Sequence, residues 1–542
     1  MPDTLSPKEV LGLYPPHGGT LSTLLDTRAR AVGDHAFVVF RGHSYSYGQV
    51  QALVNRAAAM YAARGIGAGD RVGVMSRNHI TTVVTFLALA RLGATMCPFN
   101  PDFREEEAGY VIGHAELSGM LCSPACLPIV RKAVAQSHRP TWILLNESDD
   151  AHAGESTWDA AIAAAPPDAP SDAATPQATC VFIYTSGTTG LPKAVMHTQR
   201  SVVLSGEGFV GRMHLQPQDR LLCILPTFHI NALFYSVCGS LAAGAAVILE
   251  EGFSASRFWA TVKESGATEV NFVAAIPGIL AKRPRTEFVA GHCLAKICVA
   301  PLSQETETLF TETFGVRDLL DGYGMSEAPG VCITPLQGQR RRGSVGRLCR
   351  HPDPDLRFAE LRVVDEAGND LPAGQVGELM VRTPTLMQGY FRDPEQTRAA
   401  FRDGGWFITG DLGYRDADDF IWFVGRKKDI IRKRGENISG AELDRVVGNH
   451  PAVQEAAAIA VPAELGEDEV LVAVVLRPGQ RVAAREIADW CAARLARIKV
   501  PRYVVFVDDL PHTATHRVEK HKLKKDPALL ARAIDLQEPT RG

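Results

Sequence analysis

Alternation of helical and extended patterns constrains the fold of this chain most strongly. Apolar side chains recur at helical spacing in residues 49–64, and a short apolar stretch, residues 71–76, follows after a glycine-rich turn. A second helical pattern covers residues 81–94, and the same alternation returns around residues 219–229 and 245–251. Helices that alternate with apolar strands predict an α/β fold, with mainly parallel sheets that are covered by helices.

The pattern changes after about residue 340. Short strands are expected at residues 359–365 and 376–382, separated by turns that contain glycine and proline, so a small β-layer completes the large N-terminal domain. Earlier in the chain, residues 147–179 are rich in Asp, Ala and Pro and are predicted to form a surface loop.

A compact αβ pattern restarts at the segment VGRKKDIIRKRGENIS. Helices are expected at residues 440–450 and 483–496, with strands between and after them. We therefore predict a large N-terminal domain, residues 1–427, and a small mobile α+β domain, residues 428–542, which would act as a lid.

Length and charge limit the function classes. A chain of 542 residues is long enough for two or more domains, and its formal charge of −4 leaves no global excess of positive charge for nucleic acid. The N-terminus lacks the pattern of a signal peptide, and the longest apolar run is too short for an integral membrane segment, so a cytoplasmic location is expected. The 11 cysteines show no metal-binding spacing and are interpreted as reduced core thiols.

The segment YTSGTTGLPK, residues 184–193, carries the strongest chemical signal. Small residues allow backbone N–H groups to approach phosphate oxygens, hydroxyls add donors, and Lys193 adds a positive charge. The loop follows a predicted buried strand, at the edge where parallel sheets bind ligands. It is not a Walker A motif, because Leu191 follows Gly190. A flexible linker is the alternative, but the preceding strand favours a polyphosphate site.

Two further motifs are less specific by themselves. In DGYGMSEAPG, residues 321–330, Tyr323 could stack on a planar base, Ser326 offers a donor and Glu327 offers a carboxylate to a divalent cation. In WFITGDLGYRD, Asp411 is suited to accept both hydroxyls of a ribose. An ordinary turn and a helix-capping aspartate are the respective alternatives.

Together these segments, in this order, resemble the adenylate-forming superfamily, which includes acyl-CoA synthetases, adenylation domains and beetle luciferases. The resemblance covers nearly the whole chain and includes GRKKDIIRKRGENIS near the predicted domain boundary. Within the superfamily, PFNPDFREEE and PTFHINALFYSV look most like the crotonobetaine/carnitine-CoA ligase branch.

The resemblance implies a role for each matching position. The residues that would bind nucleotide phosphates are Thr185, Ser186, Gly187, Thr188, Thr189, Lys193 and Ser326. Those that would frame adenine are Val299, Ala300, Pro301, Gly322, Tyr323 and Gly324, with Met325 beside them. Glu327 would bind Mg²⁺, Asp411 and Arg426 would hold the ribose, and His229 would stand beside the acyl pocket.

The implied reaction has two steps. A carboxylate attacks the α-phosphorus of ATP and expels pyrophosphate, and coenzyme A then displaces AMP from the acyl-adenylate. In this superfamily the C-terminal domain rotates between the steps about one hinge residue, which corresponds to Lys428. The pocket-lining residues are small, which leaves room for a medium chain or a ring, and they are expected to be Ala274, Ala275, Ala300 and Gly330.

One position departs from the family pattern. Arg517 stands where the superfamily usually has a lysine that reaches the acyl carboxylate, and Lys520 follows one helical turn later as a substitute. An ATP- and Mg²⁺-dependent acyl-CoA ligase is the favoured function. The alternatives are a stand-alone adenylation enzyme that loads a carrier protein, or a degenerate nucleotide-binding homologue without catalysis. The sequence also leaves a homodimer open.

Overall fold

The computed structural model describes residues 4–137, 140, 142–147, 155–166, 168–185, 192–273, 275–433, 436–462, 468–512 and 518–536. The chain divides into two compact units, one formed by Met1–Glu360 with Val381–Phe407 and the other by Leu361–Met380 with Ile408–Gly542. The domain boundary near Lys428 that the sequence suggests stays a prediction. No helix in the described part of the chain is long and apolar enough to cross a membrane.

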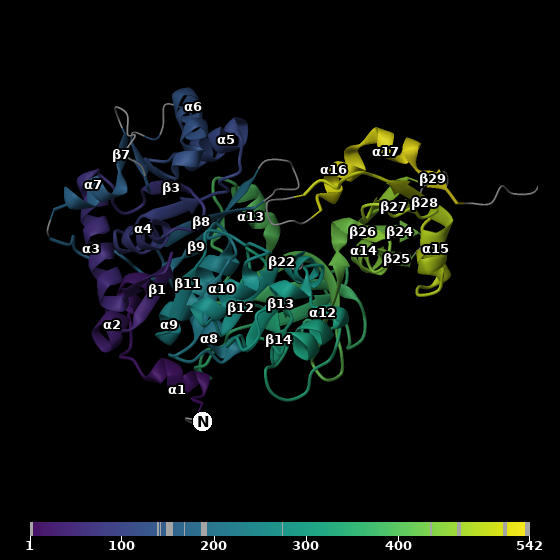
Figure 1. Ribbon diagram of the computed structural model, residues 1–542, viewed down its shortest axis with the longest axis horizontal. Helices are drawn as coiled ribbons and strands as arrows, with labels where there is room; N and C mark the ends of the chain where they lie inside the picture. Colours follow the sequence, from purple (N-terminus) through teal and green to yellow (C-terminus); the bar gives the residue numbers. More distant parts are fainter. Residues whose placement is uncertain are drawn as a thin grey trace, which may run out of the picture. The chain divides into compact units, whose positions relative to one another are not determined.

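Two large sheets form the frame of the first unit (Figure 1). The strands of the eight-stranded sheet, in spatial order, are β20 (Gly389–Tyr390), β9 (Lys193–Thr198), β8 (Thr179–Thr185), β4 (Thr95–Pro98), β3 (Arg71–Met75), β5 (Gly119–Cys122), β6 (Ile143–Leu145) and β7 (Glu155–Thr157). Those of the seven-stranded sheet are β14 (Asp318–Leu320), β13 (Lys296–Ala300), β12 (Glu269–Val273), β10 (Arg220–Cys223), β11 (Ala246–Leu249), β1 (Ala36–Phe40) and β2 (His43–Ser46).

Most neighbouring strands of these sheets run parallel, which confirms the predicted sheet type. The helices of this unit are α1 (Pro7–Gly12), α2 (Leu21–Val32), α3 (Tyr47–Ala63), α4 (Ile80–Arg91), α5 (Glu105–Ala115), α6 (Leu127–Ser137), α7 (Trp158–Ala163), α8 (Gln199–Met213), α9 (Cys238–Ala243), α10 (Phe258–Ser265), α11 (Ala275–Ala281), α12 (Gln304–Thr308) and α13 (Pro394–Ala400). A π-helical segment, η2 (Asn231–Val237), leads into α9.

Local signals explain where the elements begin. Ser46 caps α3 by accepting from the backbone N–H of Gln49, whose side chain in turn accepts from the Ser46 N–H.

The predicted surface loop at 147–179 is wrong in part, because β7 and α7 lie within it. Trp158 of α7 is buried and provides the apolar contact that makes this short helix stable.

Smaller sheets complete the chain. A three-stranded sheet contains β15 (Gly322–Tyr323), β16 (Cys332–Ile333) and β17 (Arg347–Leu348). A five-stranded sheet has the order β18 (Glu360–Val364), β19 (Gly377–Arg382), β22 (Trp406–Arg415) and β21 (Phe401–Arg402), and β23 (Ile421–Arg426) pairs with β22. These short strands match the β-layer that the sequence predicts.

The C-terminal part of the second unit is a small αβ structure. Its strands are β24 (Ile430–Lys433), β25 (Glu436–Ser439), β26 (Val453–Pro462), β27 (Asp468–Leu476), β28 (Tyr503–Phe506) and β29 (Ile534–Asp535), and its helices are α14 (Gly440–Gly448), α15 (Ala484–Ala492), α16 (Lys520–Lys525) and α17 (Pro527–Arg532). Buried aliphatic side chains from the helices and from the sheet β26-β27-β28-β29 form its core.

Candidate functional site

The predicted phosphate loop connects two antiparallel strands. Thr185 ends β8 and lies opposite Lys193, the first residue of β9. The predicted phosphate ligands from Ser186 to Thr189 lie outside the described residues. The Lys193 ammonium contacts Oε1 of Gln396 and lies 5.3 Å from the ring centroid of Tyr390. The hairpin therefore places a lysine beside the point where the loop begins and ends.

Glu327, the predicted metal ligand, is held on two sides. Its Oε1 atom accepts a hydrogen bond of 3.0 Å from the Tyr390 hydroxyl, and its carbonyl accepts one of 2.8 Å from the N–H of Met387. Burial, and then the negative charge of Glu327, raise the pKa of Tyr390, so its hydroxyl stays a donor. Tyr390 is thus a common neighbour of two predicted site residues, Lys193 and Glu327.

A single carboxylate in this position suits magnesium. Mg²⁺ in nucleotide enzymes is commonly bound by one or two carboxylates together with substrate phosphates, rather than by a complete cage of protein ligands. No group of three or more His, Cys, Asp or Glu side chains suited to a metal occurs among the described residues. Glu327 beside the hairpin therefore fits a cation that arrives with ATP.

Buried polar residues fix the backbone of the DGYGMSE segment. His197 of β9 donates from Nε2 to the carbonyl of Ser326 at 2.7 Å, and burial lowers the pKa of His197 to about 4, so the ring is neutral. Asp321 accepts the N–H groups of Leu302 and Gly322, at 3.0 and 2.8 Å. Its carboxylate thereby links the residue after Val299–Pro301 to the start of the DGYG segment.

The residues predicted to frame adenine occupy these two segments. Val299 is buried in β13, whereas Ala300 and Pro301 are exposed. Tyr323 is buried in β15, and Gly322 and Gly324 stand on either side of it. A Cβ atom at Gly324 would lie 2.8 Å from the backbone nitrogen of Gly330, so only glycine fits there. Met325 and Ala328 exchange backbone hydrogen bonds of 3.1 Å, which close the turn that carries Ser326.

His229 lies just before η2 and accepts the N–H of Leu233 at its carbonyl, at 3.2 Å. Its ring packs against Phe228, with centroids 4.4 Å apart. Of the small residues expected to line the acyl pocket, Ala274 lies outside the described residues, and Gly330 is buried. The place of His229 beside the acyl group stays a prediction.

In the second unit, Asp411 and Arg426 are opposite each other on the paired strands β22 and β23. The Arg426 Nε atom lies 3.6 Å from Oδ1 of Asp411, and Asp411 is only 3% exposed. Thr409 fixes the strand locally, since its hydroxyl accepts the Asp411 N–H and donates to the carbonyl of Leu379. The two predicted ribose ligands are therefore neighbours.

The hinge and lysine candidates also lie in this unit. Lys428 belongs to a short 3-10 turn between β23 and β24, and its carbonyl accepts the ammonium of Lys524 at 3.0 Å. Lys520 begins α16 and forms an ion pair of 2.5 Å with Asp444. Arg517 lies outside the described residues. Lys520 must leave Asp444 before it can act on a substrate.

Several residues of the site were missed by reasoning from the sequence. Tyr390, His197 and Asp321 act through tertiary contacts, and of these three only Asp321 lies within a motif quoted above, as the first residue of DGYGMSEAPG. No local signal marks Tyr390 as a partner of Glu327, because 63 residues separate them.

Comparison with known proteins identifies families and relatives that bind AMP or are named as CoA ligases. The model of the AMP-binding enzyme family matches residues 25–391, and that of the AMP-binding enzyme C-terminal domain matches residues 442–517. A sulfoacetate–CoA ligase of Cupriavidus necator is 34% identical over 93% of this chain and 97% of its own length. A crotonobetaine/carnitine–CoA ligase of Salmonella paratyphi A is 28% identical over 94% of this chain and 99% of its own length.

Solved structures extend the match to the fold. The crystal structure of ATP-bound MatB from Rhodopseudomonas palustris superposes with a TM-score of 0.82 at 27% identity, covering 93% of this chain and 98% of that one. Since the larger family model alone covers most of the chain, and the smaller one follows it in order, the protein belongs to the AMP-binding enzyme family.

Proposed function

We propose that this chain joins a carboxylic acid to coenzyme A in two steps driven by ATP. The enzyme is an AMP-forming acid–thiol ligase that uses ATP, Mg²⁺ and coenzyme A. One observation carries the assignment to this site, namely that Tyr390 contacts both Lys193 and Glu327 beside the Ser/Thr/Gly loop. A cation and a metal-binding carboxylate held together suit a polyphosphate with its magnesium ion.

In the first step the acid attacks the α-phosphorus of ATP. Lys193 and the loop from Thr185 to Thr189 bind the phosphates that leave as pyrophosphate, and Ser326 meets the α-phosphate. Glu327 holds Mg²⁺, which neutralises negative charge on the phosphoryl oxygens when it is bound. His197 and Asp321 keep the backbone around Ser326 and Gly322 in place.

In the second step the thiol of coenzyme A displaces AMP. Asp411 and Arg426 hold the ribose, and Lys428 serves as the hinge about which the C-terminal part changes position between the steps. Relatives of similar length named as CoA ligases support coenzyme A as the acceptor, in preference to a carrier protein. The cytoplasmic location and the homodimer suggested by the sequence stay predictions.

Product analysis of the purified chain tests this function. The protein is incubated with ATP, Mg²⁺, coenzyme A and each member of a panel of carboxylic acids, and AMP, pyrophosphate and acyl-CoA are quantified. We expect AMP and acyl-CoA in equal amounts with at least one acid, and neither with Glu327→Gln. AMP that forms at the same rate without coenzyme A, and is accelerated by an acyl carrier protein, would support the carrier-loading alternative.

A further inference from the structure

A buried arginine lies where the acyl group is expected. Arg212, in the last turn of α8, is only 7% exposed. Its Cζ atom lies 4.3 Å from the ring centroid of Tyr235 and 5.2 Å from that of Phe209. A Cβ atom at Gly330 would lie 1.5 Å from Nη1 of Arg212, so the absence of a side chain at Gly330 is what admits the guanidinium.

The Arg212 guanidinium interacts with the Tyr235 side chain, but no carboxylate among the described residues balances its charge. Its Nη2 atom is buried and has no hydrogen-bond partner, and no carboxylate in the described residues forms an ion pair with it. Burial raises the pKa of the Cys298 thiol to about 12 and that of Cys349 to about 11, so both neighbours are neutral at physiological pH. A buried charge without a counter-charge costs several kcal/mol, roughly, which favours an anion supplied by a ligand.

The neighbours of Arg212 belong to the predicted acyl pocket. Tyr235 lies on η2, the segment that follows His229, and Gly330 was itself expected to line the pocket. Cys298 is two residues before Ala300 on β13, so the two side chains share one face of the strand. That face is partly exposed, whereas Ile297 on the other face is buried. The guanidinium therefore lies near the face of β13 that carries Ala300, one of the predicted pocket residues.

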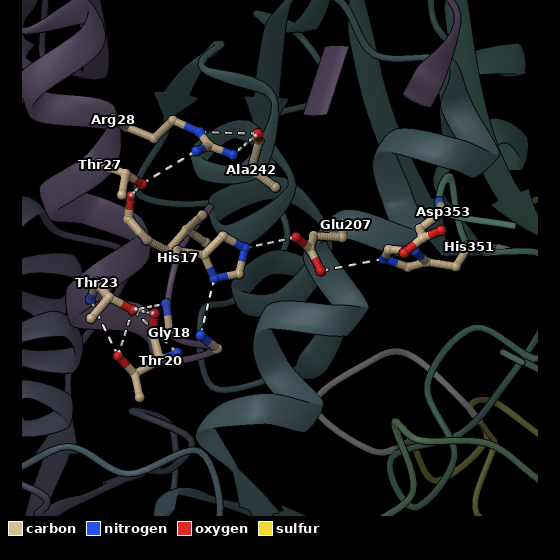
Figure 2. Close-up of polar contacts among 12 residues, drawn as sticks. His17, Gly18, Thr20, Thr23, Thr27, Arg28, Glu207, Ala242, His351 and Asp353 are labelled. Atoms are coloured by element: carbon tan, nitrogen blue, oxygen red, sulfur yellow. Dashed lines mark hydrogen bonds and ion pairs between the residues drawn. The ribbon is translucent and has the colours of Figure 1, made fainter. Parts of the chain in front are cut away.

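The nearest carboxylate on the same helix has other partners. Figure 2 shows Glu207 of α8 between two histidines, with Oε1 at 2.9 Å from Nε2 of His17 and Oε2 at 3.3 Å from Nε2 of His351. The Nδ1 atom of each ring accepts a backbone N–H, so Nε2 is the donor in both. Burial opposes the charge of Glu207, but these hydrogen bonds outweigh it and lower its pKa to about 2. Glu207 thus anchors α8 and leaves Arg212 for another anion.

We infer that Arg212 binds a second anionic group of the acid, so that the substrates are carboxylic acids bearing a further carboxylate, sulfonate or phosphonate. The inference rests on the proposed ligase function and specifies its substrate class. A planar guanidinium can hold two oxygens of such a group at once. An acid with a cationic group in that position would instead meet an unpaired positive charge and be rejected.

Matched pairs of acids test the substrate class. kcat/KM is measured by AMP formation for succinate against butyrate, and for sulfoacetate and malonate against propionate. We expect the dianionic acid of the better pair to be preferred by at least about tenfold, which corresponds to roughly 1.4 kcal/mol. Arg212→Met should reduce kcat/KM for that dianion by about 100-fold, mainly through KM, and change the monoanion by less than about threefold.

Two further variants separate charge from folding. Arg212→Lys should retain part of the preference for the dianion, because it keeps a positive charge. Arg200→Met, an exposed position on the same helix, should behave as wild type. Thermal stabilisation of each variant by ATP and Mg²⁺ reports that it is folded. If Arg212→Met does not fold, the preference of the wild-type enzyme for the dianion and the part of it that Arg212→Lys retains test the inference.

Contrary outcomes are distinct. A wild-type enzyme that prefers the monoanions, or equal losses for both acids in Arg212→Met, would overturn the inference while the ligase function stands. Equal losses would mean that Arg212 acts on the reacting carboxylate or only on the fold. If no acid yields AMP, the proposed function fails and this inference fails with it.

Discussion

The hydroxyl of Tyr390 donates a hydrogen bond of 3.0 Å to Oε1 of Glu327, across 63 residues of chain. Tyr390 lies in β20, which pairs with β9, and Lys193 begins that same strand. The end strand of the eight-stranded sheet therefore determines how the proposed metal ligand and the proposed phosphate lysine are oriented.

Tyr390→Phe is expected to slow acyl-adenylate formation by about tenfold, or roughly 1.4 kcal/mol of barrier, because Glu327 loses the donor that orients it. The concentration of Mg²⁺ needed for half-maximal rate should rise as well, which a purely structural effect would not cause. Tyr45→Phe, at a partly exposed strand position, serves as the matched control. An unchanged Mg²⁺ dependence in Tyr390→Phe would argue against this positioning role.

Asp411→Ala should weaken ATP and AMP binding by about tenfold or more. The carboxylate is buried beside Arg426, and each hydrogen bond that it makes to a ribose hydroxyl is worth roughly 1 to 3 kcal/mol. Titration calorimetry with ATP measures the change. Removing the 2′-hydroxyl, by using 2′-deoxy-ATP in place of ATP, should cost less affinity in the variant than in wild type. If Asp411→Ala weakens ATP and 2′-deoxy-ATP equally, Asp411 does not bind the 2′-hydroxyl of the ribose.

Lys428→Pro should separate the two half-reactions, because proline fixes φ and prevents the backbone rotation that a hinge needs. We expect the rate of adenylation, measured by pyrophosphate release, to fall less than the rate of thioester formation from supplied acyl-adenylate. Lys427→Pro, one residue earlier, tests whether position 428 is special. If both half-reactions fall together in Lys428→Pro, the hinge lies at another residue.

Arg517 and Lys520 are the two candidates for the positive charge that we propose assists adenylation. Because Lys520 is paired with Asp444, we expect Arg517→Ala to slow acyl-adenylate formation by at least about tenfold and Arg517→Lys to retain or raise activity. Lys520→Ala should mainly lower the stability of the fold around α16. A silent Arg517→Ala together with a severe Lys520→Ala would reverse this assignment.

Glu269→Gln should stabilise the protein more at pH 8.5 than at pH 5. Glu269 is fully buried in β12, neither of its oxygens has a hydrogen-bond partner, and burial raises its pKa from 4.5 to about 8. The folded state holds a proton that the unfolded state releases, so wild-type stability falls as pH rises between these two values.

Glutamine resembles the protonated form, and the gain at high pH should be on the order of a few kcal/mol. Urea unfolding at both pH values measures the difference between variant and wild type. The same difference at the two values would mean that Glu269 does not change protonation on folding.

The sequence alone determined the features that depend on neighbours in the chain. Alternating patterns predicted the parallel sheets, because helical and extended periodicities are local. The glycine at position 324 belongs to a motif that is recognisable in a short window. The family resemblance assigned both Asp411 and Arg426 to the ribose, and these residues are opposite each other on adjacent strands.

Only the tertiary structure decided which side chains lack or share a partner. The sequence around Arg212 does not reveal that its guanidinium is buried without a carboxylate partner, and the sequence around Tyr390 does not reveal its hydrogen bond to Glu327. Likewise, the burial of Trp158 accompanies a helix within a segment that the sequence predicted to be a surface loop. Charge compensation and burial depend on which distant segments packing brings within a few ångströms, and the order of residues along a chain does not contain that distance.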